Sequence, residues 1–343
     1  MKGLPSWAVP FLYFSYSSGV FCATIKNYNK KGKEGFTMSA IKEELAAFIA
    51  AHTSDDFVMT PITMREASLH TAWDQELPKV AMADVVDTVL EGCDVYDVPV
   101  RIYIPDTSRP LPVLICYHGG GFVIDTVAVY DPVCRRIAQA TQHIVISPEY
   151  RLAPENPYPA AYEDALAVAR KALPKLDELQ IPHEADLTLC GDSAGGCLAA
   201  YTSQALQHDA SLPLTHQILV YPCLDMTHSF PSIQENCNAK TGFTPAKMVW
   251  YFNQFFRNGD DRRAASPLFG ELSAAMPATL VLTTQFCPFR DEGREYVRRL
   301  TANGVRAETY NYDNMVHSYL NFEKICYDEI CDTYRRMADF LQL

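Results

Sequence analysis

Short apolar runs alternate with longer amphipathic stretches from about residue 80 to the end of the chain. An apolar run of about four to eight residues bounded by Gly, Pro or polar residues is typical of a buried strand, whereas apolar positions three and four residues apart are typical of a helix. Alternation of the two predicts an α/β domain with a mostly parallel central sheet and helices on both faces. The expected strands are residues 84–90, 98–104, 111–117, 143–147, 187–190, 217–221, 279–286 and 307–312, and the expected helices are 132–140, 160–171, 197–207, 290–303 and 327–341.

The N-terminal part of the chain follows neither pattern at first. Residues 1–37 contain an aromatic-rich apolar stretch that Pro10 and the polar residues 15–18 interrupt, and several lysines follow. An uninterrupted stretch of this kind would indicate a signal peptide or a membrane segment. We interpret residues 1–37 as a leader, a linker or a segment added for expression, before a chain that starts at Met38. Residues 38–79 carry helical periodicity.

Ser193 lies between a short apolar run and an Ala/Leu-rich helical stretch, in the sequence Gly-Asp-Ser-Ala-Gly. In this G-x-S-x-G pattern, Gly191 and Gly195 let a strand and a helix pack closely, and the serine stands at the tip of the turn as a nucleophile. An ordinary Gly-rich turn has the same pattern, so the assignment of Ser193 depends on support elsewhere in the chain.

A second apolar run leads directly into His-Gly-Gly-Gly-Phe at residues 118–122. Successive glycines remove every Cβ from a loop and let its backbone N–H groups approach a substrate oxygen. We therefore expect the N–H groups of Gly120, Gly121 and Ala194, the residue after the nucleophile, to form an oxyanion hole. His118 starts the loop, and we predict a structural role for it.

His317 follows the last predicted strand and is the candidate general base. Its position after Ser193 fits the chain order of nucleophile, acid and base that accompanies the G-x-S-x-G turn. The other eight histidines have no comparable setting, and we expect them to be surface residues or satisfied buried ones.

Several motifs occur together in a fixed order. They are His-Gly-Gly-Gly-Phe at 118–122, Tyr-Arg-Leu-Ala-Pro-Glu at 150–155, Pro-Ala-Ala at 159–161 with Asp164, Gly-Asp-Ser-Ala-Gly-Gly at 191–196, Tyr-Pro at 221–222 and Ser-Pro-Leu at 266–268. From about residue 80 onwards, their combination resembles the hormone-sensitive-lipase family of α/β-hydrolases, in particular the bacterial carboxylesterases and acetyl esterases. The resemblance implies a catalytic α/β-hydrolase domain at 80–343 with a helical cap, built from residues 38–79 and an insertion at about 227–258. It also implies a serine carboxylesterase for short- to medium-chain acyl esters that needs no cofactor.

One position departs from the family's pattern. The family carries its catalytic acid as the first Asp of Asp-Pro-Leu-Arg-Asp-Glu, and here residues 287–292 read Cys-Pro-Phe-Arg-Asp-Glu. A neutral thiol at Cys287 is a weak acceptor and cannot stabilise an imidazolium as a carboxylate does. We expect Asp291 to act as the acid instead. Asp313 is one alternative, and a dyad in which the Cys287 thiol or a water fills the gap is another; Asp291 would then be a first-turn acid that the helix dipole stabilises.

Composition excludes several classes of function. The net charge of −12 argues against nucleic acid as a partner, because phosphate binding requires a basic face. Eleven irregularly spaced cysteines in a chain long enough to build a core indicate reduced thiols and a cytoplasmic protein. No Cys-x-x-Cys pair and no histidine pair at metal-ligand spacing occurs in the sequence, so we expect no metal. We expect no stable membrane insertion, and a homodimer remains possible.

These residues together predict an acyl-enzyme mechanism. Ser193 would attack an ester carbonyl, His317 would transfer the proton, and water would release the acyl group. We expect the best substrates to have acyl chains of at most about six to eight carbons, because a cap closes over a bounded pocket. A different hypothesis, motivated by Cys287, is a catalytically impaired hydrolase scaffold that binds a small ligand.

Overall fold

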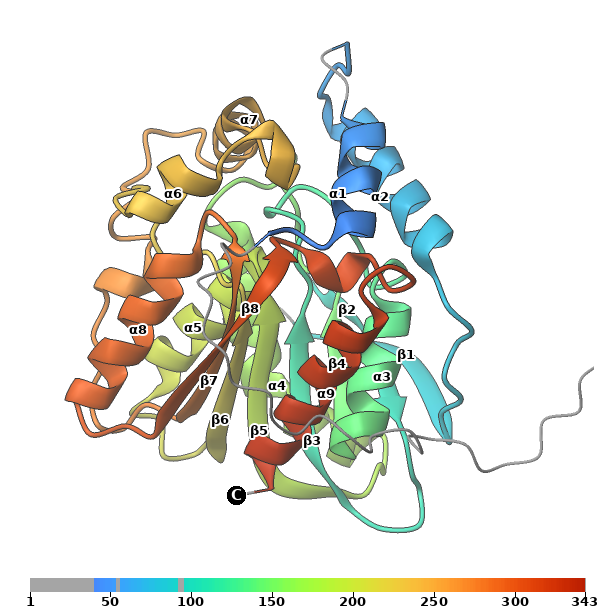
Figure 1. Ribbon diagram of the computed structural model, residues 1–343. Coiled ribbons are helices and arrows are strands. Elements are labelled where there is room, and N and C mark those ends of the chain that lie inside the picture. The colour runs from blue at the N-terminus through green and yellow to red at the C-terminus, as the bar shows by residue number, and fades with distance from the viewer. Residues whose placement is uncertain (1–39, 54–55, 92–95, 343) are drawn as a thin grey trace, which may run out of the picture. The chain divides into compact units, whose positions relative to one another are not determined.

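A sheet in the order β1-β2-β4-β3-β5-β6-β7-β8 runs through the part of the chain that the computed structural model describes, residues 40–53, 56–91 and 96–342 (Figure 1). The strands are β1 (Asp84–Leu90), β2 (Val98–Ile104), β3 (Leu111–Tyr117), β4 (Ile144–Pro148), β5 (His183–Asp192), β6 (Leu214–Val220), β7 (Ala278–Phe286) and β8 (Ala307–Val316). β2 pairs antiparallel with β1 and β4, and all pairs from β4 to β8 are parallel. The predicted α/β class and mostly parallel sheet are confirmed. The leader or linker expected at residues 1–37 lies outside the described residues.

Helices cover both faces of this sheet. α3 and α9 pack together on one face, and α4, α5 and α8 lie on the other (Figure 1). A sheet covered on both sides has strands buried on both faces, which is why β3 and β4 read as continuous apolar runs. The helices of the two faces are α3 (Asp131–Thr141), α9 (Tyr327–Leu341), α4 (Ala160–Glu178), α5 (Ala194–Leu206) and α8 (Arg290–Ala302).

Two strands, β5 and β8, extend furthest beyond the apolar runs that predict them. β5 begins at His183 because its first residues, although polar and partly exposed, continue the pairing with β3. β8 continues to Val316, past a register shift between Thr284 and Phe286 of β7, and so ends directly before His317. Exposed polar residues give no apolar signal, but a neighbouring strand can still pair with their backbone.

Four further helices lie over the edge of the sheet at which the parallel strands end (Figure 1). They are α1 (Glu43–His52) and α2 (Pro61–Gln75) from the N-terminal region, and α6 (Pro231–Asn236) and α7 (Pro245–Phe255) between β6 and β7. We call these four helices the cap helices. In open α/β sheets, ligands bind outside the carboxyl ends of the strands, so this edge is where a site is expected. None of the described helices is long and apolar enough to cross a membrane.

Candidate active site

Ser193 stands at a sharp turn between β5 and α5. Its backbone has φ 52° and ψ −116°, a strained conformation that is characteristic of the nucleophile elbow. The Ser193 N–H donates to the Val220 carbonyl oxygen at 2.9 Å, which fixes the turn against β6. A Cβ on Gly195 would lie 2.0 Å from the Tyr117 carbonyl oxygen, and one on Gly191 would lie 2.3 Å from the backbone of Gly195. Both glycines are therefore required by close packing.

The structure brings Ser193 and His317 together across 124 positions of sequence. Ser193 Oγ lies 2.8 Å from His317 Nε2, and both residues are buried. Donation from the hydroxyl requires an unprotonated Nε2, which leaves the imidazole proton on Nδ1. The pair therefore has the geometry of a nucleophile and its base.

Cys287 occupies the position beside the other nitrogen of His317. Its Sγ lies 3.1 Å from His317 Nδ1 and accepts a hydrogen bond from the Phe289 N–H at 3.3 Å. Burial raises the pKa of the Cys287 thiol well above its ordinary value. The third group of the constellation is thus a neutral thiol, as one of the sequence alternatives held.

The structure corrects the expectation that Asp291 orients His317. α8 begins at Arg290, so Asp291 lies in its first turn, where its Oδ1 accepts from Arg290 Nε at 2.8 Å and its Oδ2 accepts from the Ser232 N–H at 3.2 Å. Burial opposes ionisation of Asp291, but the hydrogen bond and charge of Arg290 prevail and hold its pKa below the usual value. This carboxylate joins α8 to α6, and Nδ1 of His317 is left to Cys287.

Asp313, the other acidic alternative, also lies elsewhere. Its Oδ1 accepts a hydrogen bond from Asn311 Nδ2 at 2.8 Å along β8, and its side chain is exposed. A residue four positions before His317 on a strand does not turn back toward the imidazole. The structure therefore corrects this alternative as well.

His317 lies in an aromatic enclosure. The rings of Tyr221, Phe289 and Phe243 present themselves to its imidazole roughly edge-on, at centroid distances of 4.9, 5.0 and 5.4 Å. Burial, reinforced by the positive charge of Lys247, lowers the pKa of His317 to about 3. With no carboxylate at Nδ1 to offset this burial, the imidazole is neutral and available as a base over the whole ordinary pH range.

The glycine loop lies at the same edge as the elbow, because Tyr117 of β3 pairs with Gly191 of β5. Gly120 and Gly121 have φ of 95° and 60°, in the region that favours glycine. A Cβ on Gly121 would also lie 2.6 Å from the ring of Tyr251, on α7. Glycine therefore determines the conformation of this loop, and the loop packs closely against Tyr251 of α7.

His118 is buried at the start of this loop. Its ring stacks on Tyr150 at 4.2 Å, and its Nδ1 lies 2.9 Å from the Gly119 carbonyl oxygen. Burial lowers the pKa of His118 to about 4, which keeps it neutral. These contacts are those of a packed structural residue, in line with the prediction.

Sequence reasoning missed two charged residues near the site. Asp125 has a φ of 71° and accepts a short hydrogen bond from Ser68 of α2, so a cap helix and the glycine loop meet at this carboxylate. Lys247 of α7 is partly buried and acts electrostatically on both His317 and Asp125. Only Asp125 had a detectable signal, a turn-favouring residue three positions after the glycine loop.

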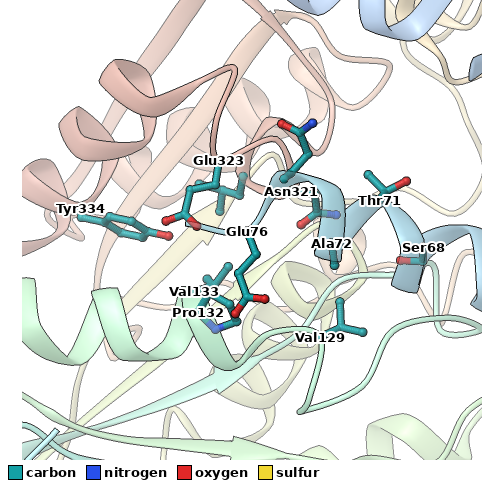
Figure 2. A pocket seen from close by; sticks show the side chains of 12 residues that line it. Ser68, Thr71, Ala72, Glu76, Val129, Pro132, Val133, Asn321, Glu323 and Tyr334 are labelled. Carbon is teal, nitrogen blue, oxygen red and sulfur yellow. The ribbon is translucent and has the colours of Figure 1, made fainter. Parts of the chain in front are cut away.

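A small pocket of about 50 Å³ lies between α2, α3, α9 and the short helix Tyr319–Asn321 (Figure 2). Its lining includes Ser68, the partner of Asp125, but neither Ser193 nor His317. Its lining also includes Glu323 and Gln75, and the buried Oε1 of Gln75 has no hydrogen-bond partner among the described residues. A space of this size holds a few water molecules, not an ester. Within the described ranges, no group of three or more His, Cys, Asp or Glu side chains could hold a metal ion.

A family model described as the alpha/beta hydrolase fold matches residues 114–321, which include the glycine loop, Ser193 and His317. The chain belongs to this family of α/β-hydrolases. Relatives of this hydrolase are named carboxylesterases. Together with the family match, they confirm the resemblance to the hormone-sensitive-lipase family.

This hydrolase is similar to several characterised esterases. Carboxylesterase NlhH of Mycobacterium tuberculosis is 37% identical over 232 residues, which are 66% of this chain and 72% of that protein. Esterase LipI of the same organism is 34% identical over 248 residues, 69% of this chain and 75% of the relative. Among solved structures, an esterase of Pyrobaculum calidifontis aligns with a TM-score of 0.79 and 30% identity, covering 88% of this chain and 98% of that one.

Proposed function

We propose that this hydrolase is a serine carboxylesterase that cleaves short- to medium-chain acyl esters through an acyl-enzyme on Ser193. The observation that carries the proposal is the 2.8 Å contact between Ser193 Oγ and His317 Nε2 at the tip of the elbow. Its relatives are named carboxylesterases and esterases, which supports the broader class of carboxylic ester hydrolase.

Acylation uses both atoms of this contact. As Ser193 Oγ attacks the ester carbonyl carbon, its proton passes to His317 Nε2 and the carbonyl oxygen takes the negative charge. The backbone N–H groups of Gly120, Gly121 and Ala194 stabilise this oxyanion. Collapse of the tetrahedral intermediate breaks the bond to the alkoxy oxygen, which leaves as the alcohol with the proton from His317.

Deacylation repeats the same steps with water. His317 Nε2 takes a proton from the attacking water, a second oxyanion forms in the same place, and Ser193 Oγ leaves with the proton as the free acid is released. With the ester and one water molecule as reactants, both halves of the reaction balance.

Cys287 orients the imidazole of His317 but brings no negative charge to it. The hydrogen bond between Nδ1 and Sγ selects the tautomer in which Nε2 can accept the proton of Ser193. A neutral thiol stabilises the imidazolium less than a carboxylate would, so we expect slower turnover than in a hydrolase with Asp at this position.

The cap limits the acyl chain. Phe243, just before α7, packs against His317, and Tyr251 of α7 lies against Gly121. Each methylene that enters an apolar pocket contributes about 0.8 kcal/mol until the pocket is full. We expect kcat/KM on p-nitrophenyl esters, measured from acetate to decanoate, to be highest at or below about six to eight carbons; best turnover on long-chain triglycerides would contradict this.

Covalent labelling distinguishes this proposal from a ligand-binding scaffold that has lost its chemistry. A fluorophosphonate probe reacts quickly only with an activated serine. We expect labelling of the wild-type protein and none of Ser193→Ala, with the site located by peptide mass spectrometry. Absence of labelling at every pH from 6 to 9, in protein with a cooperative unfolding transition, would overturn the esterase proposal and favour the binding scaffold.

A further inference from the structure

Lys247 places a positive charge at the wall of the candidate active site. Its Nζ lies 6.0 Å from the ring centroid of Phe243, whose ring is 5.4 Å from that of His317. Phe243 also stacks on Tyr251 at 6.3 Å, the residue that closes over Gly121. The ammonium group is thus held on the same aromatic wall that faces both the base and the glycine loop.

The fold gains little from a cation at this position. Lys247 lies in the first turn of α7, where Thr244 caps its N–H, and the positive end of a helix dipole disfavours a positive charge. Burial disfavours that charge as well and lowers the pKa of Lys247. A neutral side chain of the same length would fill the space at a lower electrostatic cost.

Lys247 also has no close counter-ion among the described residues. Its Nζ donates to the Gly242 carbonyl oxygen at 3.4 Å, and no carboxylate of the described part of the chain lies within 4.0 Å of it. Asp125 attracts it from a greater distance but is already bound by Ser68. A partly buried ammonium with one long hydrogen bond retains donors for a further anionic group.

We propose that Lys247 is a specificity-determining residue that favours esters carrying a carboxylate, or another compact anion, on their acyl or alcohol part. This inference rests on the proposed esterase function and narrows its substrate class. A substrate anion would replace water around the ammonium and form a charge-assisted hydrogen bond in a site of low dielectric constant. Neutral esters of the same length would lack this contact.

The test compares matched pairs of esters. For the acyl side we choose monomethyl adipate against methyl hexanoate, and for the alcohol side 4-acetoxybenzoate against 4-methylphenyl acetate, each followed by acid release in a pH-stat at pH 7.5. We expect the wild type to favour the anionic member of at least one pair. In Lys247→Met the ratio of kcat/KM between anionic and neutral esters should fall about tenfold or more in that pair, the scale of a hydrogen bond to a charged group.

Three further variants sharpen the result. Lys247→Arg should retain most of the preference, because the charge remains, and Lys247→Glu should reverse it. Lys240→Met removes the same charge from an exposed position in the same insertion and should leave the ratio unchanged. The pair in which the ratio changes identifies the side of the ester that carries the anion.

Two results would overturn the inference while leaving the esterase proposal intact. One is a change of less than twofold in both ratios for Lys247→Met. The other is an equal loss of kcat/KM on neutral and anionic esters, which would indicate that Lys247 acts through its attraction to Asp125 and not through contact with the substrate. If the wild type cleaves none of the four esters, the proposed function itself fails.

Discussion

Cys287 lies where a carboxylate would bind the protonated form of His317 most strongly. In its place the thiol accepts a hydrogen bond at 3.1 Å from Nδ1 but brings no negative charge, and burial holds the pKa of His317 at about 3. A general base works only in its neutral form, so activity is lost as the pH falls through the pKa of the base. In the wild-type enzyme, His317 therefore stays neutral, and able to act as a base, down to low pH. Its protonated form, however, is only weakly stabilised.

Cys287→Asp exchanges these properties. A carboxylate at Nδ1 should raise the pKa of His317, so the acidic limb of kcat/KM should move to higher pH than in the wild type. Better stabilisation of the imidazolium should increase kcat at pH 8 by about tenfold or more, within the 10⁴-fold scale of the acid's contribution in serine hydrolases. Profiles of kcat/KM from pH 4 to 9 on p-nitrophenyl butyrate measure both effects.

Asp291→Asn is the matched control for this experiment. Its carboxylate binds Arg290 and Ser232 and has no contact with His317, so we expect kcat to stay within about twofold of the wild type. A loss approaching 10⁴-fold in folded Asp291→Asn would restore this residue to the catalytic constellation. An unchanged acidic limb in Cys287→Asp would show that the thiol does not govern the base.

The sequence predicted Ser193 and His317 but favoured Asp291 over Cys287 as the partner of His317, and the reason for this error is geometric. Glycine spacing reports directly on backbone packing, because a Cβ at Gly195 would collide with the Tyr117 carbonyl. The carboxylate of Asp291 is only four positions beyond Cys287, but α8 starts between them and directs that side chain toward α6. The expected helix at 290–303 began at the right residue, but the sequence could not show that α6 packs beside it and gives Asp291 the Ser232 N–H as a partner.

At the scale of elements, the elbow depends on how closely α5 approaches β3 and β5. The parallel pairing of Tyr117 with Gly191 sets the glycine loop beside the nucleophile, and the absence of side chains at Gly191 and Gly195 allows the helix to start there. Rigid strands and a helix therefore fix the distance between the serine and the loop. Backbone packing, and not the choice of side-chain rotamers, therefore determines the geometry of this part of the site.

Gly195→Ala should disrupt this junction. Its Cβ would lie 2.0 Å from a backbone oxygen of β3 that cannot move without breaking the sheet, so we expect loss of esterase activity and destabilisation by about 3 kcal/mol or more. Thermal unfolding and p-nitrophenyl butyrate hydrolysis measure the two effects. In Gly293→Ala of α8 the new Cβ would meet the Thr283 methyl at 3.1 Å, a tight contact that small shifts relieve, so we expect a much smaller loss of stability. Equal stability of the two variants would contradict this account.

The elements themselves were largely predictable, with exceptions that have a common cause. Buried parallel strands such as β3 and β4 are apolar on both faces and read clearly. The first residues of β5 and much of β8 are polar or exposed, so their pairing was invisible in the sequence. For α7 the sequence indicated an insertion at about 227–258, but not that Lys247 lies near His317, because that depends on how the helix packs on the sheet.

At the scale of the whole molecule, buried histidines and buried carboxylates have opposite effects on how the stability of the fold depends on pH. Burial lowers the pKa of His118 and His317, so the unfolded chain binds more protons at these positions below about pH 6.5 and stability falls with acid. Burial raises the pKa of Asp192 to about 7 and that of Asp125 to about 6, so at these positions the folded chain binds more protons and stability falls as the pH rises from about 4 to 7. The two effects offset each other between about pH 4 and 6.

Asp192→Asn removes one side of this balance. The amide keeps an oxygen for the hydroxyl of Tyr130, which donates to Asp192 Oδ2 at 2.9 Å, but it no longer ionises. The wild type loses stability from pH 5 to pH 8 as Asp192 ionises, and the variant does not. The difference in free energy of unfolding between variant and wild type should therefore grow by roughly 2–3 kcal/mol from pH 5 to pH 8. Urea unfolding at both pH values measures this shift. Asp106→Asn lies in the loop after β2, where the Asp106 carboxylate accepts hydrogen bonds from Ser108, and it should show the same change between the two pH values as the wild type. The same change in Asp192→Asn as in the wild type would refute the account.

The distance of 124 positions between Ser193 and His317 also has a consequence for the time at which this chain becomes reactive during its synthesis. The nucleophile and the glycine loop are made early, on strands that can pair as soon as they emerge. The base follows β8, which pairs with β7 at the end of the strand order, so it is made after every strand of the described sheet. A nascent or C-terminally clipped chain that lacks β8 therefore carries a serine without a proton acceptor. Such a chain has no esterase activity until the long-range pairing of the sheet is complete. Hydrolytic activity therefore reports that the sheet has formed.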